Sequence, residues 1–81
     1  MTANPLDIVV LTRDIPAHGL RAGDLGAVVE VHAPDAIAVE FVAASGRTQA
    51  LLTLPTADIR GVVDDDLVSV RSSTAATDEP A

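Results

Sequence analysis

The sequence contains no cysteine, lysine, tryptophan or tyrosine, and Phe41 is its only aromatic residue. The absence of cysteine excludes disulfide frameworks, cysteine-ligated zinc sites and thiol nucleophiles. The absence of lysine excludes Schiff-base chemistry, and one ring is too few for a platform on which bases stack. Several classes of enzyme and of nucleic-acid-binding protein are therefore excluded by composition.

Positive charge is also scarce, because five arginines face 12 acidic residues and the net charge is −7. Polyanions and anionic membranes are bound through cations, so we expect neither a nucleic-acid nor a membrane partner. No apolar run approaches the roughly 18 residues of a membrane span. The first residues have no basic or hydrophobic signal region, and we expect a cytoplasmic location.

The 81 residues are enough for one small domain, and its strongly apolar residues are mostly Val, Leu and Ile, which favour strands. The clearest strand is the third, in which Ile37, Val39 and Phe41 alternate with smaller or polar residues. In the second, Val29 and Val31 share one face. The predicted strands are residues 7–13, 27–32, 37–42, 48–54 and 59–63.

The connections carry the glycines and prolines. Residues 14–26 hold three glycines and a proline, which indicates a long structured loop in which Gly19, Gly23 and Gly26 need positive φ or close approach. Gly46 is suited to a left-handed position in a hairpin. Residues 55–58 are suited to one turn of 3-10 helix.

These features predict an all-β fold, a small five-stranded SH3-like barrel with a 3-10 turn before the last strand. Closure into a barrel would remove exposed sheet edges. The alternative is an open five-stranded meander that hides one face in a dimer. We expect a flexible N-terminus over residues 1–5, the barrel over 6–63, and an acidic, mostly disordered tail over 64–81.

The sequence also resembles a family of small bacterial proteins known only as domain of unknown function 4926. The resemblance covers roughly residues 6–62 and rests on these segments: Asp7-Ile8-Val9-Val10-Leu11, Asp14-Ile15-Pro16, Gly19-Leu20, Gly23-Asp24-Leu25-Gly26-Ala27-Val28-Val29-Glu30-Val31, Val39-Glu40-Phe41-Val42, Gly46-Arg47-Thr48 and Ala50-Leu51-Leu52-Thr53-Leu54.

This resemblance implies a small SH3-like fold and no established activity. Some members of the family are encoded beside another small protein, which suggests a paired system of the toxin–antitoxin type. The Gly23–Val31 segment is also similar to the loop and strand of KOW-type barrels in ribosome- and transcription-associated proteins.

Catalytic and metal-binding groups are sparse. His18 and His32 are the only histidines, and no serine has a nucleophile-elbow pattern around it. Residues 64–66 are three consecutive aspartates, whose side chains point to alternate sides of an extended chain and so do not converge on one metal ion. The loop glycines match no phosphate-binding motif. We expect no catalytic residue, no metal and no cofactor.

The residues most suited to recognition are in the long loop, where Asp14, His18, Arg21 and Asp24 could form a polar patch on a rigid scaffold. An apolar outer face is also expected, because a small domain cannot bury every strand on both sides. We predict that this outer face carries Val9, Leu11, Val28, Val42 and Leu51. Of these, Val28 and Leu51 are the candidate partner-binding residues.

Three functions remain open. The first is a non-enzymatic adaptor or accessory subunit that acts through a protein partner or as a homo-oligomer. The second is an antitoxin or immunity protein that covers the basic cleft of a neighbouring toxin through charge complementarity. The third, which the acidity disfavours, is a nucleic-acid-binding barrel of the KOW kind.

Overall fold

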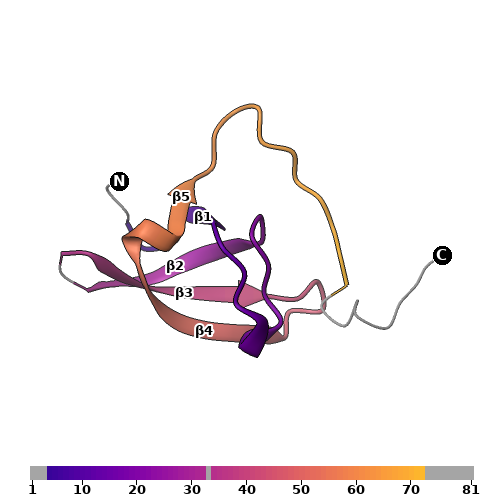
Figure 1. Ribbon diagram of the computed structural model, residues 1–81, viewed down its shortest axis with the longest axis horizontal. Coiled ribbons are helices and arrows are strands. Elements are labelled where there is room, and N and C mark those ends of the chain that lie inside the picture. The colour runs from indigo at the N-terminus through magenta and orange to yellow at the C-terminus, as the bar shows by residue number, and fades with distance from the viewer. Residues whose placement is uncertain (1–3, 33, 73–81) are drawn as a thin grey trace.

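One antiparallel sheet makes up the fold, in a computed structural model that describes residues 4–32 and 34–72. Its strands follow the order β4-β3-β2-β1-β5 (Figure 1). The prediction of an all-β protein with five strands is confirmed. The elements are β1 (Ile8–Leu11), the 3-10 turn η1 (Pro16–His18), β2 (Leu25–His32), β3 (Ala36–Val42), β4 (Thr48–Pro55), the 3-10 turn η2 (Thr56–Asp58) and β5 (Ile59–Gly61).

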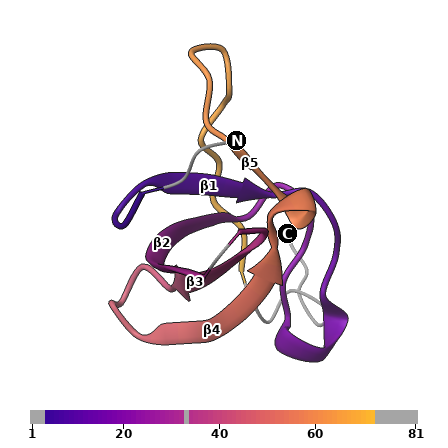
Figure 2. The same ribbon diagram turned by 90° about the vertical axis from the view of Figure 1, so that its left-hand side faces the viewer.

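The sheet bends strongly, so that β4 curves round towards the side on which β5 lies (Figure 2). The predicted 3-10 turn is η2, which leads from the end of β4 directly into β5. Among the described residues no ladder joins β4 to β5, so hydrogen bonds do not close the sheet. Both strands are therefore edges.

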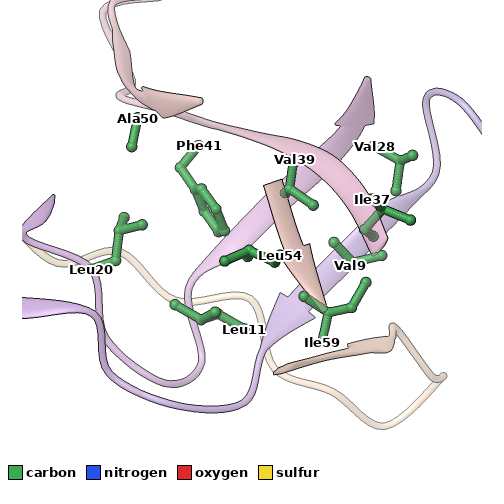
Figure 3. Close-up of a cluster of buried hydrophobic side chains, with 10 residues drawn as sticks. All are labelled: Val9, Leu11, Leu20, Val28, Ile37, Val39, Phe41, Ala50, Leu54 and Ile59. Atoms are coloured by element: carbon green, nitrogen blue, oxygen red, sulfur yellow. The ribbon is translucent and has the colours of Figure 1, made fainter. Parts of the chain in front are cut away.

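The core lies inside this bend and contains ten buried apolar side chains (Figure 3). As predicted, Ile37, Val39 and Phe41 of β3 all point into it. Gly26 on β2 lies against Val39 and Phe41, and a Cβ atom there would be 2.5 Å from Cγ1 of Val39. The need for close approach at Gly26 is thus confirmed. The core residues are Val9, Leu11, Leu20, Val28, Ile37, Val39, Phe41, Ala50, Leu54 and Ile59.

The predicted outer face is wrong in β1 and β2. Val9, Leu11 and Val28 are fully or almost fully buried, and they belong to the core. In β1 four consecutive apolar residues hide the alternation, and in β2 the register shifts between Val28 and Glu30. Val28 therefore cannot touch a partner on the surface of the folded chain, whereas Val42 and Leu51 are exposed as predicted.

The chain continues beyond β5 as residues 62–72, which we call the C-terminal strap. It arches away from the sheet and returns near the connection between β3 and β4 (Figure 1). Residues 64–72 of the predicted tail lie in this strap. Residues 73–81 of that tail, and residues 1–3 of the predicted N-terminal segment, lie outside the described residues.

Candidate partner-binding groove

The loop between β1 and β2 is held by its own backbone. An isolated bridge joins Ile15 to Leu20, and the N–H of Gly23 donates to the carbonyl of Leu11 at 2.7 Å. Gly19 and Gly23 have φ values of +69° and +97°, which confirms the predicted need for glycine at both positions. The loop therefore offers a fixed frame for the side chains that it carries.

Asp24 is the central polar residue of this frame. Its Oδ2 accepts the backbone N–H of Arg21 at 2.8 Å, and its own N–H donates to the carbonyl of Arg21 at 3.0 Å. Asp14 acts in a similar way, because its Oδ1 accepts the N–H of Ala22 at 2.9 Å. Both carboxylates hold the loop in shape, and Asp24 also faces the strap.

Arg71 of the strap meets Asp24 in a two-pronged contact. Its Nε donates to Oδ1 of Asp24 at 2.9 Å, while its Nη2 donates to Oδ2 and to the carbonyl of Gly19, the latter at 3.0 Å. A planar guanidinium fits a carboxylate in this way, with two parallel bonds. We call Asp24 and the Gly19 carbonyl the arginine socket.

The charges in the socket shift the titration of both partners. Partial burial acts to raise the pKa of Asp24, but hydrogen bonds from Arg71 and from the Arg21 backbone, with the charges of both arginines, bring it below the ordinary value. The hydrogen bond to Asp24 raises the pKa of Arg71. The pair is therefore fully ionised at neutral pH.

Around the socket lies an open groove with a volume of about 560 Å³. Leu20, Leu25, Phe41 and Val42 supply its apolar part, and the strap residues 69–72 form one wall. The remaining lining residues come from the loop, from the β3–β4 connection and from the start of β4: Gly19, Ala22, Gly23, Asp24, Ala43, Ala44 and Gln49.

The groove continues onto the outer face of the sheet. The ladders pair Ile8 with Ala27, Ala27 with Glu40, and Glu40 with Leu51, so these four side chains form a row across four strands. Ile8 and Leu51 at its ends are 51% and 59% exposed. Leu25 and Val42 are exposed on the same face and also line the groove. Ile8, Leu25, Val42 and Leu51 are called the outer-face patch below.

The predicted polar patch is only partly assembled. Asp14 and Asp24 support one loop, whereas Arg21 donates its backbone N–H to Asp24 and acts on it otherwise only through its charge, because its side chain is exposed. His18 is exposed in η1, and its carbonyl accepts the side-chain amide of Gln49 at 3.1 Å.

Arg71, the residue that marks the groove, was not predicted from the sequence. Its partner, Asp24, is 47 positions away along the chain, and only long-range packing brings the two together. The one available signal was that Arg71 is the single cation in an otherwise acidic segment.

In residues 4–32 and 34–72, no three His, Cys, Asp or Glu side chains come together in a cluster that could hold a metal ion. The Nε2 atom of His32 lies 4.0 Å from Oε1 of Glu30. The same described ranges contain no helix with the length and apolar character needed to cross a membrane.

The model of one family matches the chain, namely DUF4926, a domain of unknown function, over residues 6–61. No curated protein and no solved structure matches it. Because the match covers more than half of the chain, including all five strands and the loop that carries Asp24, the protein belongs to the DUF4926 family.

Proposed function

We propose that this DUF4926 protein is a non-enzymatic accessory protein that acts by binding a basic protein partner. The observation that carries the proposal is the outer-face patch, since Ile8, Leu25, Val42 and Leu51 lie exposed on one face of a small sheet. Exposed apolar side chains gathered on one face of a sheet are typical of interaction sites. The net charge of −7 favours a partner of opposite sign, because complementary charge speeds association and excludes acidic competitors.

We further propose that the bent sheet belongs to the SH3-like barrel class. Two features support this assignment: the long loop between β1 and β2, and the 3-10 turn η2 between β4 and β5. Such a scaffold holds loops and one sheet face rigidly, which suits recognition.

The test is capture of the partner by the full chain and by two matched variants. Leu51→Asp places a charge in the outer-face patch, while Val63→Asp places one in the strap at a residue of nearly equal exposure, 57% against 59%. We expect the wild type and Val63→Asp to retain the same basic protein in stoichiometric amount, and Leu51→Asp to lose at least about tenfold in affinity, as for a central interface residue. Far-ultraviolet circular dichroism verifies that both variants are folded.

Two outcomes would overturn the proposal. One is equal retention of the basic protein by Leu51→Asp and by the wild type. The other is a concentration-dependent doubling of mass in light scattering that Leu51→Asp abolishes, because the patch would then belong to a second copy of this chain.

A second candidate function is that of an antitoxin. The exposed Asp64 and Asp65, together with the −7 net charge, would complement the basic cleft of a toxin that acts on nucleic acid. Relief of toxicity when the chain is co-expressed with a neighbouring small protein would support it. Unchanged toxicity would exclude the antitoxin function and leave the accessory role as the single proposal.

A further inference from the structure

The arginine socket already holds Arg71 of the protein itself, and the strap that carries this residue makes its described contacts with the sheet mainly through charged groups. Leu67, Val68 and Val70 of the strap are 92%, 76% and 94% exposed, so apolar burial does not hold the strap in place. At its end, Arg71 enters the socket and its side chain is only 28% exposed. Arg71 therefore ties the end of the strap to the loop.

The socket owes its geometry to the loop. The N–H of Arg21 orients the Asp24 carboxylate. The backbone around Asp24 is held by Leu11, whose carbonyl accepts the N–H of Gly23 and whose N–H donates to the carbonyl of Asp24. The left-handed conformation of Gly19 positions the carbonyl that accepts from Nη2. None of these contacts involves Arg71, so we expect the socket to persist when Arg71 leaves.

We propose that the arginine socket binds an arginine from an extended segment of the basic partner, and that Arg71 is the internal occupant which this arginine displaces. The inference rests on the proposed function, since it specifies which side chain of the basic partner binds at the socket, next to the outer-face patch. Leu25 and Val42 border the socket, so apolar residues beside the incoming arginine would pack on them.

The geometry selects arginine over lysine. Nε and Nη2 reach the two oxygens of Asp24 while Nη2 also reaches the Gly19 carbonyl, and this spacing matches the rigid fork of a guanidinium. An ammonium group is a compact donor that cannot span both carboxylate oxygens and the carbonyl in this arrangement. A lysine in the same segment should bind more weakly.

The internal occupant should also set the affinity for outside ligands. A tethered group competes at an effective concentration that is commonly in the millimolar range. An outside arginine must overcome this competition in the wild type but not in a variant without Arg71. We therefore expect Arg71→Ala to bind an arginine peptide about two- to fivefold more tightly than the wild type.

The experiment titrates an end-capped peptide with the sequence of residues 67–72 into the isotope-labelled full chain, up to about 5 mM, so that millimolar dissociation constants are measurable. Nuclear magnetic resonance shifts of the Gly19, Asp24 and Leu25 amides report binding. The proteins are the wild type, Arg71→Ala, and Arg71→Ala combined with either Asp24→Asn or Asp58→Asn. Asp58 is the matched control, because it pairs with Arg13 elsewhere and its side chain is 19% exposed, against 20% for Asp24.

We expect Arg71→Ala to bind the peptide, the added Asp24→Asn to abolish binding, and Asp58→Asn to leave it unchanged. A peptide with lysine in place of the arginine should bind at least about tenfold more weakly, because it loses the fork. Absence of shifts in Arg71→Ala, or equal binding with Asn at position 24, would overturn the inference. The inference would also be overturned if the wild type is a dimer and Arg71→Ala is a monomer, because Arg71 of one copy would then bind the socket of the other.

Failure here is distinguishable from failure of the proposed function. If Leu51→Asp loses the basic partner while the arginine peptide does not bind, the outer-face patch is supported as the binding site for the partner, and the socket is not a binding site for its arginine. If no basic partner is retained by any variant, the proposed function itself is wrong.

Discussion

The sheet and the C-terminal strap are stabilised by opposite means. The sheet buries ten apolar side chains and pairs its strands in four antiparallel ladders. The strap leaves Leu67, Val68 and Val70 in solvent and depends on two arginine–carboxylate contacts, Arg60 with Asp66 and Arg71 with Asp24. Burial supplies most of the stability of a fold, whereas exposed ion pairs contribute little. The strap can therefore leave while the sheet stays folded, and Arg71 leaves the socket with it.

The largest effect is expected in the core. Phe41→Ala removes the only aromatic ring from the buried cluster, and we predict a loss of about 3–5 kcal/mol in the free energy of unfolding. Val42→Ala is the control, since the next residue along β3 points outward and should cost less than about 1 kcal/mol. Urea unfolding followed by circular dichroism measures both, and similar losses for the two variants would contradict the assignment of faces.

A smaller loss of stability is expected at Gly26, the glycine of β2 that faces the core. Gly26→Ala puts a methyl group 2.5 Å from Cγ1 of Val39 and 2.9 Å from the Phe41 ring, and we predict a loss of about 1–3 kcal/mol from overpacking. Gly61→Ala is matched to it, because a methyl group there meets nothing within 4 Å. The same unfolding curves test the pair, and a Gly26→Ala chain as stable as the wild type would show that β2 and β3 lie further apart.

These core effects could be foreseen only in part. The strict alternation of Ile37, Val39 and Phe41 revealed the inward face of β3, and Pro55 with Asp58 revealed the turn before β5. The four consecutive apolar residues of β1 carry no alternation, and the register shift after Val28 inverts the face of β2. The sequence of a single strand cannot reveal the inward face of β1 or the reversed face of β2, because pairing with the neighbouring strands decides which side is buried.

The candidate site was less predictable than the fold. The loop glycines and Asp24 were identified from their positions, since backbone geometry is a local property. Arg71 was not, because two residues 47 positions apart meet only after the whole sheet has formed. Leu51 was identified correctly as exposed, whereas Val28 was not.

At the strap, the expected energies are smaller still. We predict that Asp24→Asn and Arg71→Ala each change the free energy of unfolding by about 1 kcal/mol or less, with a coupling free energy of about 0.5–1 kcal/mol in a double-mutant cycle. Asparagine keeps the acceptor for the Arg21 N–H, so the loop should remain intact. A coupling of several kcal/mol would mean that the strap is an integral part of the fold.

The smallest effect concerns acid. Hydrogen bonds from Arg60 and from the Val63 backbone lower the pKa of Asp66 to about 2, against an ordinary 3.8. The contribution of this contact is complete above about pH 4 and is lost as the pH falls through about 2, because protonation removes the charge that holds Arg60. Carboxyl-carbon resonances of Asp66 test this, and a midpoint at or above 3.8 would contradict the pairing. Asp66→Asn should break the ion pair with Arg60 already at neutral pH.

The separation between sheet and strap is tested most directly by the amide spectrum of a chain that stops after residue 63. We predict the dispersed spectrum of a folded β protein, with shift changes confined to the lining of the groove, including Gly19, Asp24 and the β3–β4 connection, and to the vicinity of Arg60. A collapsed spectrum, or changes spread through β1, β2 and β3, would contradict the view that the strap is a displaceable occupant.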